Sequence, residues 1–229
     1  MAIEKHINFF ELQKACEKPG CPLCRIVNDR AHRYIDNTLF EHVSDRGFRA
    51  LHRAAGGFCS FHAKGLVSFR DGLAVAILSR DIIEDRIEAF ENKRNWRPKG
   101  RCPVCIEREK IEQEYLDFIA SSEGNSSEER ELRGFFTASD GLCAPHYNAL
   151  LFMPNGKKRV FVPPWIKNFQ ESKYKELKKR LEKFIELSAY GRQAEFATLC
   201  EKDQLVWKEA ASCLNGSIEN LESTGVVIG

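Results

Sequence analysis

The sequence predicts a mainly α-helical protein made of two tandem related units followed by C-terminal helices. Three observations lead to this fold class. One Cys/His motif occurs twice, the segments around both copies carry apolar residues at helical spacing, and no series of alternating strands is found. At 229 residues the chain is also long enough to bury a substantial core.

The repeated motif joins a Cys-Pro-x-Cys pair to a later Gly-x-Cys-x2-His pair. The first copy lies at residues 21–24 and 57–62, and the second at residues 102–105 and 141–146. Tyr34 and Tyr115 share the offset of 81 residues that separates the two Cys-Pro-x-Cys pairs (115 − 34 and 102 − 21). The chain therefore reads as a duplication, in which a three-residue insertion near residues 121–127 explains the later offset of 84 (143 − 59).

Helices are predicted to begin at both Cys-Pro-x-Cys pairs, because proline is favoured at the first helical position. Apolar residues interspersed with charges continue this pattern to Phe40 in the first copy, and Ile106 to Ile119 contains neither glycine nor proline. Cys59 and His62 are three residues apart and would lie on the same side of a helical turn. The same holds for the second copy.

Between the two copies, a helix is predicted from about Phe69 to Lys93. Its predicted apolar face consists of Leu73, Ile77, Ile83, Ile87 and Phe90. Pro98 and Gly100 favour a break in helical structure, so the stretch from Asn95 to Gly100 is the candidate boundary between the two units.

A long helix should follow Pro163-Pro164, with Lys and Glu on one side and Gly191 at its end. Its other side carries Tyr174, Leu177, Leu181, Phe184, Ile185 and Ser188. Another helix is predicted from roughly Phe196 to Leu214. The resulting segments are 1–95, 96–156 and 157–216, packed as one compact domain, with a flexible tail at 217–229.

The motif supplies eight candidate metal ligands, which are all thiolates or imidazoles. They are Cys21, Cys24, Cys59, His62, Cys102, Cys105, Cys143 and His146. Three cysteines and one histidine per copy match the four tetrahedral ligands of structural zinc, so each copy could complete one site and two zinc ions are expected. Pairing across the copies, with Cys21 and Cys24 joining Cys143 and His146, is equally compatible with the spacing.

These ligand sets predict structural sites, because four protein ligands leave no open position for a substrate or an activated water. No residue is assigned a catalytic role. The helix starts would stabilise a Cys3His zinc site, whose formal charge is about −1, through their positive ends. An interaction or regulatory role with an unknown protein partner is the leading functional hypothesis, and enzymatic activity is not expected.

Two redox alternatives stay open. Cys16-x4-Cys21-x2-Cys24 has the spacing of plant-type iron–sulfur ferredoxins, but the second copy has Arg97 at the position matching Cys16. A dithiol redox protein would also place Cys-Pro-x-Cys at a helix start, yet the βαβ context of such motifs is absent and the Cys-x2-His pairs would be unexplained. Cys16, Cys200 and Cys213 are expected to be helix-packing residues.

Composition is that of an ordinary globular protein, with 229 residues, 43% hydrophobic residues and a net charge of +2. This balance disfavours nucleic acid and anionic membranes as partners. A basic segment at residues 92–101, in which Trp96 could stack on a base, is the nucleic-acid alternative, although a solvated linker is the preferred interpretation. The cysteines and the absence of a signal-like N-terminus predict the cytoplasm.

At the two Cys-Pro-x-Cys and Gly-[Phe/Leu]-Cys-x2-His motifs, the chain resembles a family of uncharacterised prokaryotic proteins with duplicated Cys-His motifs. The similarity includes Leu39-Phe40-Glu41 with Ser44-Asp45, and the stretch from Leu205 to Ala210 before Gly216. It therefore covers most of the chain. The resemblance implies a shared helical fold and no established activity.

Overall fold

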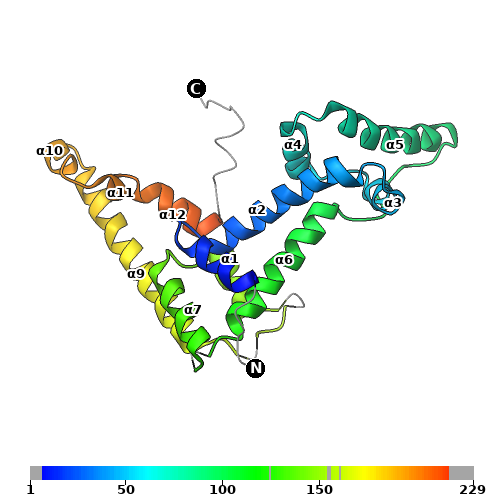
Figure 1. The fold of residues 1–229 in the computed structure, drawn as a ribbon. Coiled ribbons are helices and arrows are strands. Elements are labelled where there is room, and N and C mark those ends of the chain that lie inside the picture. Colours follow the sequence, from blue (N-terminus) through cyan, green and yellow to red (C-terminus); the bar gives the residue numbers. More distant parts are fainter. Residues whose placement is uncertain (1–6, 124, 154–155, 160, 217–229) are drawn as a thin grey trace. The chain divides into compact units, whose positions relative to one another are not determined.

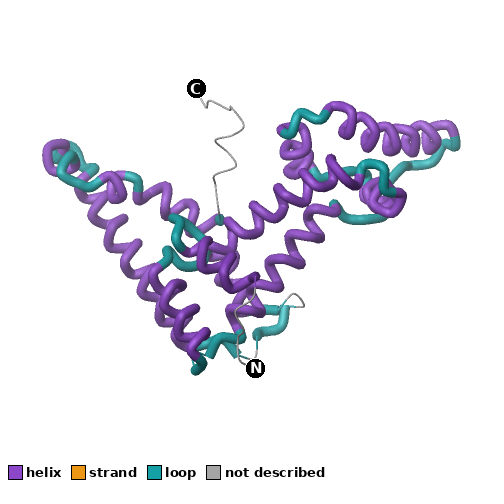
Figure 2. Tube along the Cα trace, in the orientation of Figure 1, coloured by secondary structure: helices purple, strands orange, loops and turns teal. Residues whose placement is uncertain are grey.

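A computed structural model describes residues 7–123, 125–153, 156–159 and 161–216. Within these ranges the regular structure is helical, and extended pairing is limited to an isolated antiparallel bridge between Phe152 and Lys158 (Figures 1 and 2). The mainly α prediction is confirmed. The predicted tail at 217–229 lies outside the described residues.

Helices follow one another along the described part of the chain. They are α1 (Ile7–Cys16), α2 (Pro22–Asn37), the π-helix η1 (Thr38–His42), α3 (Arg46–Ala55), α4 (Ser60–Ser68), α5 (Gly72–Glu91), α6 (Pro103–Ala120), α7 (Ser127–Ala138), α8 (Ala144–Leu151), α9 (Pro164–Leu187), α10 (Gln193–Phe196), α11 (Glu201–Gln204) and α12 (Val206–Asn215). No helix among the described residues is both long enough and apolar enough to cross a membrane.

The chain forms two compact units. The central unit is Val27–Gln113, and the terminal unit combines Met1–Ile26 with Glu114–Gly229. The terminal unit draws on both copies of the motif, whereas the predicted segments 1–95, 96–156 and 157–216 follow the order of the copies along the chain. Those segments and their packing as one domain stay a prediction. Both unit boundaries fall within helices, one in α2 and one in α6.

The central unit has an apolar core to which α2, η1, α3, α4, α5 and the start of α6 contribute. Its buried members are Ala31, Ile35, Leu39, Val43, Phe48, Leu66, Ala74, Leu78, Cys102 and Val104. Asp45 caps α3 by accepting a hydrogen bond of 2.6 Å from the backbone N–H of Phe48. Arg49 on α3 binds Asp81 on α5 through two hydrogen bonds of 2.7 and 2.6 Å, so an ion pair also joins these helices.

Helix α5 forms as predicted, but it does not pack through the predicted face. Its buried residues are Ala74, Leu78, Asp81 and Ala89. Of the predicted face, Ile77 is half-buried, whereas Leu73, Ile83, Ile87 and Phe90 are exposed. The prediction followed the larger apolar residues because they form the stronger sequence pattern. The packed face contains the smaller Ala74 and Ala89, which allow α3 and α4 to approach closely.

The terminal unit is built around the second half of α6 together with α1, α7, α8, α9 and α12. Phe9 of α1 meets Phe135 of α7 edge to face, and Phe136 of α7 does the same with Trp165 of α9. The indole N–H of Trp165 donates to the Ser122 carbonyl at 3.1 Å. Edge-to-face aromatic pairs, together with a satisfied indole N–H, therefore stabilise this core.

The long C-terminal helix forms as predicted from Pro164, but it ends at Leu187, before Gly191. The single helix predicted from Phe196 to Leu214 is incorrect, since α10, α11 and α12 take its place. Arg180 of α9 donates to the carboxylates of Asp203 and Glu209, which anchors α11 and α12 to α9. These cross-helix ion pairs had no signal in the helical periodicity.

Candidate metal centres

All four ligand pairs lie at helix N-termini. Helices α2 and α6 begin at Pro22 and Pro103, inside the two Cys-Pro-x-Cys pairs. Cys59 and Cys143 are the N-cap residues of α4 and α8, with an extended backbone, and each histidine follows in the first turn. Unpaired N–H groups at helix N-termini favour negative charge, so this placement suits thiolates.

The structure brings the eight candidate ligands together across the two copies. The outer tetrad contains Cys21, Cys24, Cys143 and His146, and the inner tetrad contains Cys59, His62, Cys102 and Cys105. In each tetrad the four ligand atoms lie within 4.8 Å of one another. The first Cys-x2-Cys thus meets the second Cys-x2-His, and the second Cys-x2-Cys meets the first Cys-x2-His. This is the crossed pairing, in nested order, and not the completion of one site by each copy.

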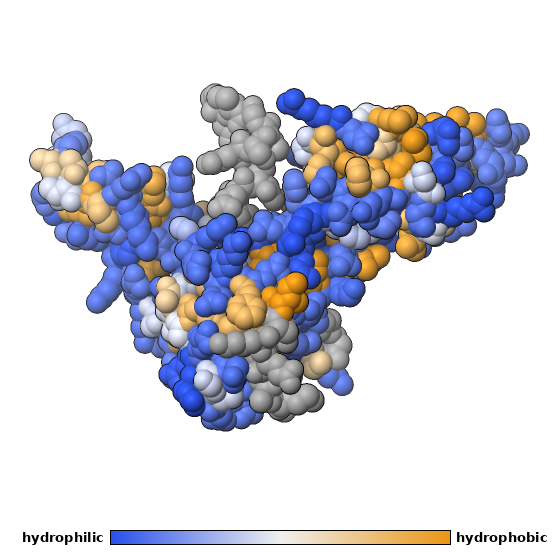
Figure 3. Space-filling model, viewed as in Figure 1, coloured by the Kyte–Doolittle hydropathy of each residue, from blue (hydrophilic) through white to orange (hydrophobic). Residues whose placement is uncertain are grey.

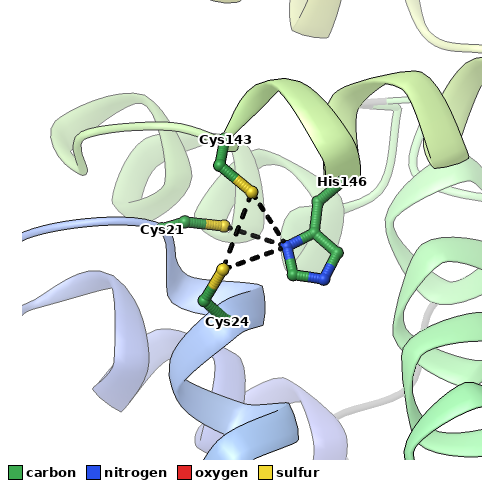
Figure 4. Close-up of side chains that lie close together, drawn as sticks. All are labelled: Cys21, Cys24, Cys143 and His146. Atoms are coloured by element: carbon green, nitrogen blue, oxygen red, sulfur yellow. Dashed lines mark hydrogen bonds between the residues drawn. The ribbon is translucent and has the colours of Figure 1, made fainter. Parts of the chain in front are cut away.

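The outer tetrad lies wholly within the terminal unit (Figure 4). The His146 Nδ1 atom faces all three sulfurs, at 3.4 Å from Cys21, 3.3 Å from Cys24 and 3.2 Å from Cys143. The sulfurs of Cys24 and Cys143 are 3.6 Å apart. Three of the four residues are buried and Cys21 is half-buried, so the cluster is largely screened from water.

The inner tetrad lies wholly within the central unit and repeats this geometry. The His62 Nδ1 atom is 3.2 Å from the sulfur of Cys59, 3.5 Å from that of Cys102 and 3.4 Å from that of Cys105. The sulfurs of Cys59 and Cys105 are 3.7 Å apart. Here His62 and Cys102 are buried, while Cys59 and Cys105 are half-buried. The inner cluster is therefore the more accessible of the two.

The separations within each tetrad are compatible with four ligands around a single metal ion. Zinc–sulfur bonds of about 2.3 Å and zinc–nitrogen bonds of about 2.0 Å give tetrahedral edges of about 3.8 Å between sulfurs and about 3.5 Å between sulfur and nitrogen. The sulfurs of Cys24 and Cys143 are 3.6 Å apart and those of Cys59 and Cys105 are 3.7 Å apart, while the sulfur–imidazole separations are 3.2 to 3.5 Å. The remaining sulfur pairs lie within 4.8 Å of one another. All nine cysteines are free thiols. Each tetrad thus has the donor set and the size of a closed four-ligand site.

Neighbouring residues hold the outer tetrad in place. Gln170 of α9 accepts from the Leu142 N–H at 3.1 Å and donates to the Leu142 carbonyl at 2.8 Å, which fixes the residue before Cys143. Gly216, with a φ of +87°, follows α12, and a Cβ there would lie 3.5 Å from the Cys24 sulfur. The end of α12 therefore lies against this cluster, and a Cβ at this position would be in ordinary van der Waals contact with the Cys24 sulfur.

A cation lies beside the inner tetrad. An Arg108 guanidinium nitrogen is 3.5 Å from the outward-facing His62 Nε2 atom, and the same side chain donates to the Asn28 side-chain oxygen at 3.4 Å. It also lies over the ring of Phe61, 5.6 Å from its centroid. A closed Cys3His zinc site has a formal charge of about −1, so Arg108 is placed to offset it.

In the outer tetrad the pKa values of neighbouring thiols are shifted in opposite directions. Burial raises the pKa of Cys21 well above its ordinary value, and the adjacent thiols of Cys143 and Cys24 raise it further. Hydrogen bonds with Cys143 and Cys21 lower the pKa of Cys24. For His146, burial lowers the pKa, but hydrogen bonds with Cys143 and Cys24 outweigh it and raise the value to about 10. A metal ion would replace these protons.

The inner tetrad differs in its histidine. Burial and the nearby Arg108 cation lower the pKa of His62 to about 4, so its imidazole is neutral, as a metal ligand must be. Burial raises the pKa of Cys105 to about 12, together with the adjacent thiols of Cys59 and Cys102. Burial opposes ionisation of Cys59, yet the backbone amide of His62 and the neighbouring thiols lower its pKa.

The remaining cysteines lie apart from the tetrads. Cys16 is buried at the end of α1, Cys213 is half-buried in α12 and Cys200 is exposed. Burial raises the pKa of Cys16 to about 12. The packing role therefore fits Cys16, whereas the exposure of Cys200 contradicts it.

Sequence reasoning did not identify the residues that support the tetrads. Arg108 follows Cys105 by three residues, so helical spacing alone could have placed it next to the site. Gln170 and Gly216 carried no such signal, because they reach the outer tetrad only through the packing of α9 and α12. Their contribution depends on tertiary structure.

Comparison with known proteins finds a family match in the N-terminal part of the chain. Residues 4–101 match the model of a family of unknown function, DUF6062. This range includes the first copy of the motif and ends immediately before Cys102. The expected resemblance to an uncharacterised family is confirmed.

The chain is also similar to the "Uncharacterized 23.9 kDa protein in xynA 3'region" of Caldicellulosiruptor sp. (strain Rt8B.4). The two are 28% identical over 136 residues, which is 57% of this chain and 65% of that relative. No solved structure gives a significant match. These comparisons add no activity to what the geometry indicates.

Proposed function

We propose that this is a zinc-binding protein with two ions, one per tetrad, and that each ion holds together the helices of its own unit. The observation that carries the proposal is that the four ligand atoms of each tetrad lie within 4.8 Å of one another, with sulfur–imidazole separations of 3.2 to 3.5 Å, close to the edge of a tetrahedron around one ion. Zinc is proposed because three thiolates and one imidazole in a closed four-coordinate set are typical of structural zinc sites. Loss of the ion would then destabilise the unit that it holds.

The distances favour a single ion over an iron–sulfur cluster. In a cluster each iron takes its own protein ligands, so ligand atoms are spread over the whole cluster and lie farther apart than around one ion. All four ligand atoms of each tetrad lie within 4.8 Å of one another. A dithiol redox role is also less well supported, because each Cys-x2-Cys pair already faces a cysteine and a histidine of the other copy.

The closed ligand sets support a structural use of the metal and an interaction or regulatory role for the protein. Nucleic-acid binding through residues 92–101 has less support, because Arg86 lies over the Trp96 ring, 4.2 Å from its centroid, and Gly56 packs against the same ring. The free thiols support a reducing compartment, and we propose the cytoplasm.

Metal analysis of anaerobically purified, tag-free protein tests the proposal. We expect about two zinc ions per chain and no visible absorption band, from the two complete donor sets. Iron with inorganic sulfide would replace the zinc proposal by an electron-transfer one. The zinc proposal would be overturned if a chelator removed all metal and the protein still kept its helical circular dichroism and its melting temperature.

Two double variants test the nested pairing with equal numbers of ligands removed. Cys24→Ser/Cys143→Ser removes two ligands from the outer tetrad alone, so one zinc ion should remain. Cys24→Ser/Cys59→Ser removes one ligand from each tetrad, so both ions should be lost or weakly held. Pairing within each copy predicts the opposite pattern, and Cys200→Ser provides a control that should keep two ions.

A further inference from the structure

Helix α5 of the central unit is apolar on two opposite sides, and only one side is packed. Ala74, Leu78 and Ala89 are buried. The opposite side carries Leu73, Ile83, Ile87 and Phe90, which are 74%, 55%, 50% and 80% exposed. At 3.6 residues per turn the two rows lie roughly half a turn apart around the helix. Figure 3 shows hydrophobic surface over the α4–α5 part of this unit.

The exposed row has the spacing of a coiled-coil seam. Its members are Leu73, Ala76, Arg80, Ile83, Ile87 and Phe90, and all are exposed. Successive members are separated by 3, 4, 3, 4 and 3 residues. This alternation, typical of a helix that packs against a partner helix, places five apolar side chains and the Arg80 side chain on one stripe. An unpaired stripe of this kind on the outside of a folded unit marks an interaction surface.

We propose that α5 pairs in antiparallel orientation with α5 of a second copy of this chain. The row matches itself when reversed, because Leu73 then lies opposite Phe90, Ala76 opposite Ile87, and Arg80 opposite Ile83 of the second copy. The smallest residue thereby meets a large one, and no layer holds two aromatic rings. Self-complementarity of this kind is what a two-fold symmetric interface requires.

Charge also selects the antiparallel orientation. In a parallel pair in the same register, Arg80 would face Arg80 of the second copy within the apolar seam, and like charges there are unfavourable. In the antiparallel register Glu84 of the second copy comes within about one residue, roughly 1.5 Å along the axis, of the level of Arg80. The Arg80 side chain is 60% exposed and lies 3.5 Å from Glu84 and 3.6 Å from Asp81 of its own helix. In the dimer, Arg80 can therefore pair with Glu84 of the second copy in place of Glu84 of its own helix.

The seam is short, so the dimer should be weak. Helix α5 has 20 residues and contributes six seam positions, which is less surface than a standard stable interface provides. We expect a dissociation constant on the order of 10 μM, at which monomer and dimer coexist in accessible concentrations. The proposal concerns the outer face of α5 and does not depend on which metal the tetrads hold.

Sedimentation of the full-length, metal-loaded protein over about 1–200 μM tests the proposal. The mass should rise from the 26.2 kDa monomer toward twice that value with concentration. Ile87→Glu should weaken association at least about tenfold, because it places an unpaired charge in the seam. Ile185→Glu, an exposed apolar residue of α9, should have no effect. Metal content and circular dichroism establish that each variant is folded.

Charge reversal tests the orientation. Arg80→Glu should weaken the dimer by bringing two carboxylates together, and Arg80→Glu/Glu84→Arg should restore it. If the wild-type protein stays monomeric at 200 μM, the proposal is overturned, even if this face of α5 binds a different protein. A dimer that Ile87→Glu leaves intact also overturns it, and failure of the double reversal to restore association overturns the antiparallel register.

Discussion

Single residues give the two tetrads different surroundings although their ligands are identical. Arg108 lies beside His62 of the inner tetrad, whereas the matching position in the first copy is Val27 (108 − 81). The outer tetrad has no such arginine at that position and instead packs against Gly216 of the α12 terminus. The inner tetrad thus has a cation beside it, whereas the end of α12 lies against the outer tetrad.

The ion pair between Arg49 and Asp81 should stabilise the central unit in a pH-dependent way. Asp81 is buried, and the hydrogen bonds from Arg49 lower its pKa below its ordinary 3.8, with the nearby Arg53 and Arg80 adding to the effect. A folded-state pKa below the unfolded one stabilises the protein above pH 3.8, and this contribution is lost as the pH falls through the folded-state value.

Asp81→Asn should therefore lower the free energy of unfolding at pH 7 by about 2 kcal/mol, the usual loss for a hydrogen bond to a charged group. Urea denaturation of both proteins at several pH values measures this. The difference between them should shrink below about pH 4, where wild-type Asp81 takes up a proton. Acid release of metal affects both proteins alike. If the difference in free energy of unfolding between wild type and Asp81→Asn stayed constant with pH, the lowered pKa of Asp81 would be contradicted.

The eight residues that the structure brings together as two Cys/His groups could be singled out from the sequence, but their pairing could not. Cys21 and Cys24 are three residues apart, and so are Cys143 and His146. This spacing alone places the two side chains of each pair close together within one helical turn. Which pair meets which depends on how α2, α4, α6 and α8 pack, over separations of 119 residues for Cys24 and Cys143 and 46 residues for Cys59 and Cys105. Local periodicity carries no information about contacts of that range.

Among the secondary-structure elements, the clearest signals were the helix starts. Proline in the Cys-Pro-x-Cys motif placed the starts of α2 and α6 correctly, because its fixed φ suits the first turn. The existence of α5 was predicted, but its packed face was not, since side-chain size does not indicate which of two apolar faces a neighbour covers. The breaks between α10, α11 and α12 were missed because apolar spacing continues across them.

The end of α3 provides a test of one element. Gly56 caps this helix with a φ of +69°, and a Cβ there would lie 2.3 Å from the ring of Trp96. Gly56→Ala should destabilise the protein by about 1 kcal/mol or more, through strain at positive φ and the displacement of Trp96. Thermal denaturation followed by circular dichroism measures the loss.

A matched substitution in α7 should have the opposite effect. Gly134 is exposed within this helix, and a Cβ there meets no atom within 4 Å. Gly134→Ala should stabilise the protein by about 0.5–1 kcal/mol, the helix preference of alanine over glycine. If both glycine variants changed the melting temperature equally, the cap and its contact with Trp96 would carry no special stability.

On the scale of the whole molecule, each compact unit contains one complete tetrad. The outer tetrad joins residues before Ile26 to residues after Glu114, and the inner tetrad lies between Val27 and Gln113. Metal in one tetrad should therefore stabilise its own unit first, because the ion links chain segments of that unit. The sequence repeats could not predict this division, since each unit takes ligands from both copies.

Hydrogen exchange measured by mass spectrometry tests this division. Cys143→Ser should speed amide exchange mainly in residues 7–26 and 114–216, and Cys59→Ser mainly in residues 27–113. Cys200→Ser is the control and should leave both patterns unchanged. Equal loss of protection throughout the chain in both ligand variants would show that the units do not respond separately to their metals.

Because the ligands are nested along the chain, the two ligand sets become complete at different times during translation. The ribosome delivers the chain from its N-terminus, so the inner tetrad has all its ligands once Cys105 has emerged, while Cys21 and Cys24 must wait for His146. During that interval the earliest pair of thiols is exposed to competing metals and oxidants without its partners. A chain interrupted between residues 105 and 143 would still hold a full inner ligand set and could never complete the outer one.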